Sequence, residues 1–337
     1  MSSSDKYVLN PHYASADVKQ EPTRAGFGRG LKKAGEMNDQ VVALCADLTE
    51  SVQMHHFRDA FPERFVQVGV AEQNLVTVAS GLARVGKIPF AASYAAFSPG
   101  RNWEQIRTTA CLNEMPVKVV GAHAGVSVGP DGATHQMLED IALMRVLPGM
   151  VVIAPGDAIE AEKATVALSQ DDKNPGYIRL AREKTPIFST ENTPFEIGKA
   201  YVLHEGKDVT LLSTGTMTAQ TLRAAKVLRE EKGISVEVIH VPTIKPLDIE
   251  TVVTSVAKTG RAVTVEEAQA AAGFGGLIAE TLGDHMPAPL LRIGMNDRFG
   301  ESGDPNALLA HFGFDTESIV QKVADFVNKR PQYKKGF

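Results

Sequence analysis

The chain alternates short, wholly apolar segments with longer amphipathic ones. Val41–Cys45 is the clearest short segment, because five apolar residues follow one another without a polar interruption. A strand with apolar residues on both faces is buried on both, which is typical of a parallel sheet covered by helices. Similar segments occur near 65–70, 88–92, 117–121 and 151–153, with helical patterns between them, one of which covers 137–147. The alternation predicts an α/β fold built on a doubly wound parallel sheet.

A second strand-helix alternation follows a segment rich in Pro, Ser, Thr and Asn. Strands are expected near 209–212, 235–241, 261–266 and 290–293. At 337 residues the chain exceeds the size at which a single core usually stops growing. We therefore predict an N-terminal extension over 1–20, a first doubly wound domain over 21–185, a linker over 186–199, a smaller doubly wound domain over 200–330 and a tail over 331–337.

Composition limits the class of function. A formal net charge of −5 argues against a nucleic-acid surface, which normally carries a basic excess. No apolar run approaches the ~18 residues of a membrane span, and the N-terminus lacks the apolar core of a signal peptide. The two cysteines, Cys45 and Cys111, suit buried free thiols in a reducing compartment. We expect a cytoplasmic protein with neither a nucleic-acid nor a membrane partner.

Glu72 is a lone carboxylate entering an otherwise apolar strand-and-helix stretch. Burying a carboxylate costs free energy unless a partner compensates it, so such a residue often serves chemistry or a specific ion pair. The local pattern alone favours a helix-start acid near the positive end of the helix dipole.

The glycine clusters near 26–30 and 273–276 lack the spacing of a dinucleotide fingerprint, and the chain has no Walker phosphate loop. Both clusters are interpreted as turns or as sites of close helix packing. The loop over 123–136 differs, because it carries His123, Asp131 and His135 after a predicted strand. Ligands of open α/β sheets bind at that end of the strands. No further ligand stands at zinc spacing, so polar recognition of a hydroxylated ligand, with histidine as donor or proton shuttle, is favoured over a metal.

Tyr94 and Phe97 follow the third predicted strand, where aromatic residues serve either the core or a ligand platform. Arg24 and Arg182 lie at the edges of predicted elements. A guanidinium there could hold an anion with two hydrogen bonds, although each arginine taken singly also suits a solvated surface charge.

Taken together, the motifs resemble the second half of the transketolase family: its pyrimidine-binding domain and its C-terminal domain. The resemblance covers roughly residues 20 to 330. The stretch 69–74 (Gly-Val-Ala-Glu-Gln-Asn) looks like the glutamate motif of the family, and 129–136 (Gly-Pro-Asp-Gly-Ala-Thr-His-Gln) looks like its substrate loop. The segment 46–49 (Ala-Asp-Leu-Thr), with Ser51, matches a segment that lies against the cofactor and the acceptor site.

The resemblance implies a role for each matching residue. Glu72 would contact N1′ of the aminopyrimidine of thiamine diphosphate, and a cofactor of that kind carries the difficult chemical step. Tyr94 and Phe97 would pack on the aminopyrimidine ring, and Asp47 would lie near the cofactor and the bound donor.

The same resemblance assigns the substrate side of the site. His123, Asp131 and His135 match residues that bind sugar hydroxyls and phosphate, and the two histidines would also act in proton transfer. The acceptor phosphate would be held by Arg24, Ser51 and Arg182.

Two departures from the family pattern matter. The third aromatic residue of the family's pyrimidine pocket falls at Gly100. The chain also lacks the diphosphate-binding half with its Gly-Asp-Gly motif, because none of its Gly-Asp pairs is followed by glycine. We therefore expect no metal ligand in this chain, and a partner subunit that supplies the diphosphate and Mg²⁺ site.

These implications define the expected function. The chain would be the C-terminal subunit of a split transketolase, active in a heterotetramer of two chains of each kind. It would transfer a two-carbon ketol unit from a ketose phosphate to an aldose phosphate, as in pentose phosphate metabolism. Alternatives are a 1-deoxyxylulose-5-phosphate synthase-like enzyme, a 2-oxo acid dehydrogenase beta subunit, a transketolase for an unusual ketose, or a non-catalytic regulatory subunit of the same fold.

Overall fold

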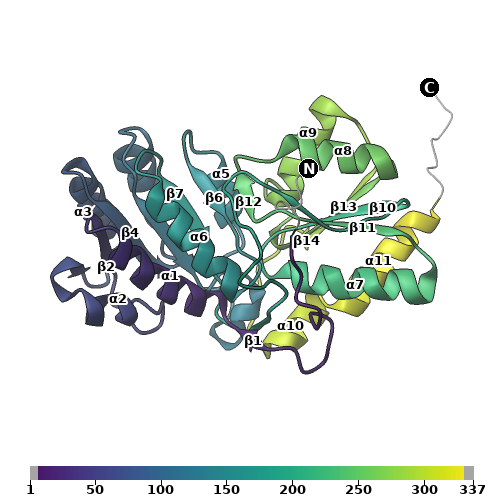
Figure 1. Cartoon of the computed structure of the whole chain (residues 1–337), viewed down its shortest axis with the longest axis horizontal. Helices are drawn as coiled ribbons and strands as arrows, with labels where there is room; N and C mark the ends of the chain where they lie inside the picture. Colours follow the sequence, from purple (N-terminus) through teal and green to yellow (C-terminus); the bar gives the residue numbers. More distant parts are fainter. Residues whose placement is uncertain (1–6, 330–337) are drawn as a thin grey trace.

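The computed structural model of the chain describes residues 7–329 and contains two large sheets that lie side by side (Figure 1). The expected tail over 331–337 and the first six residues of the expected extension lie outside the described residues. One sheet has seven strands and the other has five, and helices cover both faces of each. The predicted α/β class is confirmed.

The seven-stranded sheet has the order β12-β6-β7-β5-β4-β2-β3. Every pair in it is parallel except β12 with β6. Its strands are β2 (Val41–Cys45), β3 (Phe65–Gln67), β4 (Ile88–Tyr94), β5 (Lys118–Ala122), β6 (Val151–Ile153), β7 (Gly176–Arg179) and β12 (Thr243–Lys245). The edge strand β12 comes from the segment assigned to the second domain, so the second half of the chain completes the first sheet.

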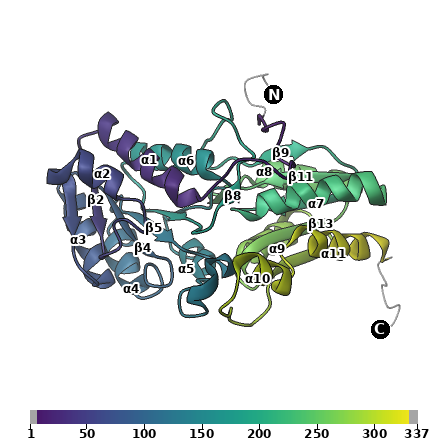
Figure 2. The ribbon, with the colours of Figure 1, turned by 90° about the horizontal axis from the view of Figure 1, so that it is seen from below.

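Helices cover the two faces of this sheet as the apolar pattern requires (Figure 2). Val41, Ala43 and Cys45 of β2 pack in a cluster with α1 (Thr23–Met37), α2 (His55–Ala60) and α6 (Ala158–Gln170). Val42 and Leu44 point to the opposite face, toward α3 (Glu72–Arg84), the π-helical turn η2 (Ile106–Cys111) and α5 (Asp140–Arg145). The short elements η1 (Pro62–Arg64) and α4 (Trp103–Gln105) lie between α2 and β3 and directly before η2, respectively. Side chains that alternate between two apolar clusters explain the unbroken apolar strand.

The glycine cluster near residue 26 lies within α1 and permits close helix packing. A Cβ at Gly26 would lie 1.8 Å from the carbonyl oxygen of Ala158, and one at Gly30 would lie 2.6 Å from that of Glu162. Both carbonyls belong to α6. Of the two interpretations of this cluster, close helix packing is therefore the right one.

Two expected elements are shorter in the structure. Strand β3 ends at Gln67 rather than near Val70, because the chain turns at Gly69 with a φ of +74°. The helix expected over 137–147 forms only as α5 (Asp140–Arg145), since Met137 bridges to Ala124 in extended conformation. The glycine-rich loop before it contains the 3-10 turn η3 (Val126–Asp131).

The five-stranded sheet has the order β14-β13-β10-β11-β9, with β9 antiparallel to β11. Helices α7 and α11 lie on one face, and α8 and α9 on the other (Figure 1). Its elements are β9 (Tyr201–His204), β10 (Val209–Ser213), α7 (Met217–Lys232), β11 (Val236–His240), α8 (Ile249–Thr259), β13 (Ala262–Gln269), α9 (Phe274–His285), β14 (Leu290–Met295), α10 (Pro305–Phe312) and α11 (Thr316–Asn328).

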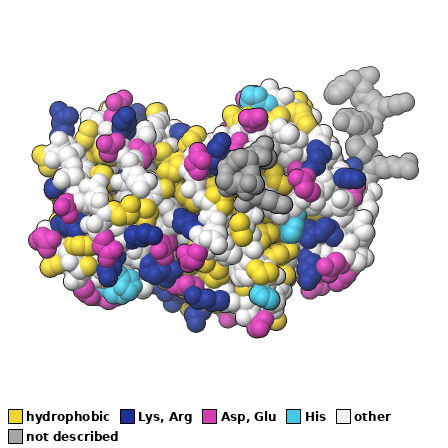
Figure 3. Space-filling model, viewed as in Figure 1, with side chains coloured by type: hydrophobic (Ala, Val, Ile, Leu, Met, Phe, Trp, Pro, Cys, Tyr) yellow, Lys and Arg dark blue, Asp and Glu magenta, His cyan; other side chains and the backbone are white. Residues whose placement is uncertain are grey.

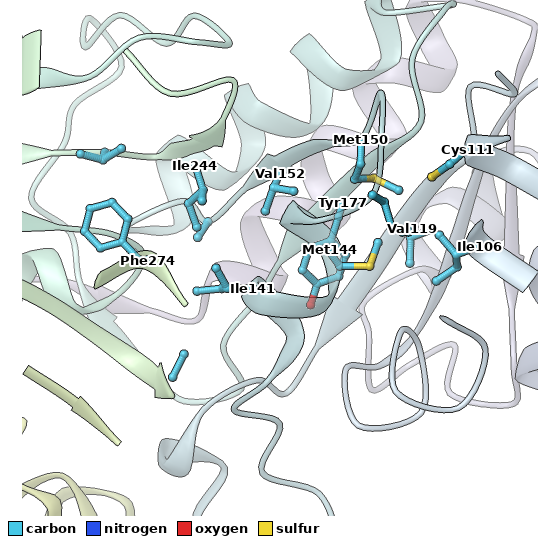
Figure 4. Packing of buried hydrophobic residues seen from close by; sticks show 14 of the residues in the cluster. Ile106, Cys111, Val119, Ile141, Met144, Met150, Val152, Tyr177, Ile244 and Phe274 are labelled. Carbon is cyan, nitrogen blue, oxygen red and sulfur yellow. The ribbon is translucent and has the colours of Figure 1, made fainter. Parts of the chain in front are cut away.

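The two sheets share one hydrophobic cluster. Figure 4 shows Ile106 and Val119 of the first half together with Ile244 and Phe274 of the second. The N-terminal segment also joins the halves, because Tyr7 is buried against Tyr201, with ring centroids 5.1 Å apart. Strands β1 (Gln20–Glu21) and β8 (Thr185–Pro186) form a separate two-stranded antiparallel ladder. The halves are thus held in a fixed relation by apolar contacts.

Cys45 and Cys111 are buried free thiols. On the face drawn in Figure 3, acidic and basic side chains are interspersed. Within residues 7–329, no helix has both the length and the apolar character needed to cross a bilayer.

Candidate active site

Parallel strands bring the predicted site residues to one edge of the seven-stranded sheet. Along that edge, in the order of the strands, Arg182 follows β7, His123 follows β5, Tyr94 ends β4, Asp47 follows β2 and Glu72 follows β3. This is the carboxyl edge, where ligands of open α/β sheets bind. Residues separated by up to 135 positions in the chain therefore line one edge because of the strand order.

Four aromatic rings pack together at this edge. The ring of Tyr94 stacks on that of His123, with centroids 3.8 Å apart and planes inclined by 28°. Phe97 lies 6.1 Å from Tyr94, and His135 meets Phe97 edge-on at 5.3 Å. The loop over 123–136 thus folds back onto the aromatic pair after β4, and the four rings form one aromatic cluster.

His123 has the most perturbed environment of the cluster. Its side chain is 2% exposed, its backbone φ is +58°, and its Nδ1 is buried without a hydrogen-bond partner in the described residues. Burial, and then the positive charges of Arg24 and Arg182, lower the pKa of His123 to about 3. The imidazole is therefore neutral at physiological pH, and it can either donate or accept a proton through its ring nitrogens.

Arg24 and Ser51 join this cluster through hydrogen bonds. Arg24 Nη1 donates to the carbonyl oxygen of Ser51 at 2.6 Å, and the Ser51 hydroxyl lies 2.6 Å from that of Tyr94. Burial, followed by the charge of Arg182, lowers the pKa of Arg24, and Arg24 Nε is buried without a partner among the described residues. Two neighbouring cations, one with an unused donor, favour an anionic ligand between them.

Arg182 also holds the loop. Its Nη1 donates to the carbonyl oxygen of Val128 at 2.8 Å and lies 3.5 Å from Asp131 Oδ1. The carboxylate of Asp131 is exposed, and the same guanidinium lies 3.6 Å from Glu183. Arg182 therefore ties the turn η3 to the edge of the sheet at which Arg24 lies.

Glu72 opens helix α3 and is 2% exposed. Arg101 Nη1 donates to its Oε2 at 2.6 Å, and Asn102 Nδ2 donates to its carbonyl oxygen at 2.8 Å. The Arg101 guanidinium lies over the ring of Phe97, 4.8 Å from its centroid. Both interpretations of Glu72 hold in part: the residue starts a helix, and it is a buried carboxylate in an ion pair.

Asp47 lies on the same edge but is exposed. Its φ is +61°, and its backbone N–H donates to Gln67 Oε1 at 2.7 Å. Gln67 Nε2 in turn donates to Thr49 Oγ1 at 3.0 Å. Gln67 therefore shapes the turn after β2, whereas the Asp47 carboxylate forms no hydrogen bond with the part of the chain described.

The sequence interpretation missed several residues of this site. Arg101 and Asn102 contact Glu72, and the only signal for them is their position just after the aromatic segment. Gln136 Nε2 donates to the carbonyl oxygens of Val126 and Glu301, which joins the loop to the second half of the chain. Glu267, also from the second half, accepts from the N–H of Ser127 at 2.6 Å, and no local pattern marks it.

Gly100 cannot carry a side chain in this conformation. A Cβ there would lie 2.1 Å from the carbonyl oxygen of Ala96. The wall that an aromatic residue would form at this position is absent, and the next residue, Arg101, packs on Phe97 instead.

Features elsewhere do not define the site. A cavity of about 630 Å³, lined by Gln40, Lys87 and Glu114 among others, lies at the amino edge of the sheet. It is therefore on the side opposite to Glu72 and His123. Among residues 7–329, no three His, Cys, Asp or Glu side chains gather closely enough to hold a metal ion.

Comparison with known proteins assigns both halves of the chain to one family. The transketolase pyrimidine-binding domain model matches residues 19–187, and the transketolase C-terminal domain model matches residues 198–319. The chain belongs to the transketolase family. The family predicted from the motifs is thus confirmed.

Similar proteins extend over almost the whole chain. A putative transketolase C-terminal section of Methanocaldococcus jannaschii is 43% identical over 309 residues, which are 91% of this chain and 96% of the relative. The 6-deoxy-6-sulfo-D-fructose transketolase subunit SqwH of a Clostridium species is 40% identical, over 90% of this chain and 94% of the relative. A solved split-gene transketolase, an inactive beta4 tetramer, superposes with a TM-score of 0.84 at 42% identity, over 91% of this chain and 99% of its own.

Proposed function

We propose that this chain is the pyrimidine-binding, C-terminal subunit of a two-chain transketolase. One observation carries the proposal: Glu72 is a buried carboxylate at the carboxyl edge, and its Oε1 accepts no hydrogen bond from the described residues. Glu72 Oε1 thus offers a ligand an acceptor that no donor of the described residues occupies, on a side chain that is otherwise buried. The neighbouring aromatic rings of Tyr94 and Phe97 suit contact with a flat heterocycle.

These residues fit the aminopyrimidine half of thiamine diphosphate. Glu72 would accept from or protonate a ring nitrogen, and Tyr94 and Phe97 would lie against the ring, with Asp47 on the adjacent turn. When bound, the cofactor supplies the nucleophilic carbon that attacks a substrate carbonyl. Glu72 would exchange a proton with that ring nitrogen at Oε1.

The histidines would then act on the substrate. His123 is neutral, and its buried Nδ1 lacks a partner among the described residues, so its ring can bind a hydroxyl or move a proton. His135 lies edge-on to Phe97, 6.2 Å from the ring of Tyr94, and can serve the same purpose from the loop. Asp131 would bind a sugar hydroxyl.

The terminal anion of a sugar suits Arg24, Ser51 and Arg182. After burial, the charges of both guanidiniums lower the pKa of His123, which supports their facing one region of the site. We propose transfer of a two-carbon ketol unit from a ketose phosphate to an aldose phosphate. The sulfosugar named for the Clostridium relative also ends in an anion, so a transketolase for an unusual ketose remains an alternative.

A partner subunit would supply what this chain lacks. The sequence has no Gly-Asp-Gly motif, and the described residues hold no metal-binding cluster. The similar tetramer of beta chains is named as inactive, which supports the need for a second kind of chain. We propose that the partner binds Mg²⁺ and the diphosphate in a heterotetramer. The buried free thiols suit a cytoplasmic enzyme.

Calorimetry with and without the partner tests whether each chain binds one part of the cofactor. Thiamine diphosphate and Mg²⁺ are titrated into this chain, into the partner and into their mixture. The mixture should bind the cofactor at least tenfold more tightly than either chain, because each chain holds only one end of the molecule. Tight binding and ketol transfer by this chain alone would overturn the split-enzyme assignment, whereas turnover without cofactor would overturn the family chemistry.

A further inference from the structure

Arg101 lies outside the motifs that assign the site, yet it makes the closest side-chain contact to Glu72. Its Nη1 lies 2.6 Å from Glu72 Oε2, a short charge-assisted hydrogen bond. The arginine side chain is 51% exposed, whereas the carboxylate is 2% exposed. The guanidinium therefore reaches a buried acid from the solvent side.

The contact with Arg101 involves only one of the two carboxylate oxygens of Glu72. Oε2 accepts from Arg101, and Oε1 accepts from none of the residues described. A carboxylate free to rotate about its last bond would present either oxygen. With Oε2 held by a cation, Oε1 is the oxygen left for a further donor.

Two further contacts fix the positions of Arg101 and Glu72 relative to each other. The guanidinium packs on the face of Phe97, 4.8 Å from the ring centroid. Asn102, the next residue, donates to the carbonyl oxygen of Glu72 and to Ser98 Oγ at 3.1 Å. Consecutive residues thus hold both the side chain and the main chain of the first residue of α3.

We propose that Arg101 is a positioning residue that orients Glu72, so that Oε1 faces the cofactor ring. The inference rests on the proposed function of Glu72 and assigns Arg101 no contact with the substrate.

A double-mutant cycle tests the proposal in the chain reconstituted with its partner and Mg²⁺. Arg101→Met, Glu72→Gln and the double variant are compared by the Kd of thiamine diphosphate. Arg101→Met should weaken cofactor binding and lower kcat, each by about tenfold, with KM for the sugar unchanged, because a charge-assisted hydrogen bond is lost. In the Glu72→Gln background, the same change should alter Kd by less than about twofold, because the residue that Arg101 orients is already disabled.

Arg107 provides a matched control. It lies in η2, shortly after Arg101 in the chain, and it is exposed. Its side chain makes no contact with the described residues. Arg107→Met should leave Kd and kcat at the values of the unmodified chain, and Arg101→Lys should recover most of the loss by restoring a cation. The unfolding temperature of Arg107→Met should match that of the unmodified chain, because Arg107 is exposed and makes no side-chain contact with the described residues.

Three results would overturn the proposal: Arg101→Met behaving like Arg107→Met, Arg101→Met binding the cofactor more tightly, or an undiminished effect of Arg101→Met in the Glu72→Gln background. None of these would remove the assignment of Glu72. That assignment fails on a different result, namely full turnover by Glu72→Gln.

Discussion

The imidazole of His123 stacks on the phenol ring of Tyr94, with ring centroids 3.8 Å apart. The stack joins the carboxyl ends of the neighbouring strands β4 and β5. One face of the histidine is therefore covered, and its buried position beside two arginines disfavours the protonated form. This places a neutral histidine at the centre of the site.

His123 should remain neutral at a pH at which an ordinary histidine is charged. The pKa of His123 is lowered to about 3 in the folded chain, so its ring should show no protonation shift between pH 8 and pH 5 by nitrogen-15 NMR. Because the folded pKa lies below the unfolded one, this group destabilises the fold as the pH falls below about 6.5. Titration of the His123 ring near pH 6.5 would contradict the buried, cationic surroundings described.

Two replacements of Tyr94 should separate the contribution of its hydroxyl to stability from that of its ring. Tyr94→Phe loses the hydrogen bond to Ser51 and should cost about 1 kcal/mol of unfolding free energy while leaving the stack intact. Tyr94→Ala also removes the ring beneath His123 and should cost about 2–3 kcal/mol. Chemical denaturation measures both values. Equal losses for the two variants would show that the ring contact contributes nothing.

Gly100 should not tolerate any side chain. Gly100→Ala places a Cβ against the carbonyl of Ala96 and should lower the unfolding free energy by about 2 kcal/mol or more. Gly81 is the control, because it is exposed in helix α3 with nothing within 4 Å of its Cβ position. Gly81→Ala should raise stability by up to about 1 kcal/mol through helix propensity. A Gly100→Ala variant as stable as Gly81→Ala would be inconsistent with the turn described.

The stability of the second half should depend on the protonation of Glu266. Burial raises the pKa of Glu266 to about 7, although the N–H groups of Phe274 and Gly275 donate to it. The folded chain therefore binds this proton more tightly than the unfolded chain. Between about pH 4.5 and 7, stability should fall as the pH rises, by about 3 kcal/mol for this group, and should then level off.

Glu266→Gln isolates this contribution, because the variant cannot ionise at that position. Its unfolding free energy relative to that of the unmodified chain should increase as the pH rises from 5 to 7.5. Parallel stability curves for the two proteins over that range would mean that Glu266 titrates alike in the folded and unfolded chains.

Much of the architecture follows from local pattern. The unbroken apolar run over 41–45 predicts a strand covered on both faces, and its residues do alternate between two apolar clusters. Strand ends then predict where polar residues converge, which places Tyr94, His123 and Arg182 on one edge. The pairing of β12 with β6 has no such signal, because three residues near 243 do not indicate which sheet they join.

The contacts made by Arg101 and Glu267 are likewise invisible in the sequence. Arg101 meets a residue 29 positions earlier, and Glu267 meets Ser127 across 140 positions. Such pairs depend on how the turn after β4 and the two halves of the chain pack, and neither follows from periodicity. The domain boundaries and the roles of the individual site residues stay predictions.

Turnover by Glu72→Gln in the reconstituted enzyme tests the central claim most directly. Glutamine keeps the shape of the side chain but cannot hold or release the proton, so ketol transfer should fall by at least about a hundredfold. Assembly with the partner, followed by sedimentation, should be unchanged, and the exposed Glu36→Gln control should keep full activity. Turnover within a few-fold of the unmodified chain would contradict the assignment of Glu72 as the acid-base group of the site.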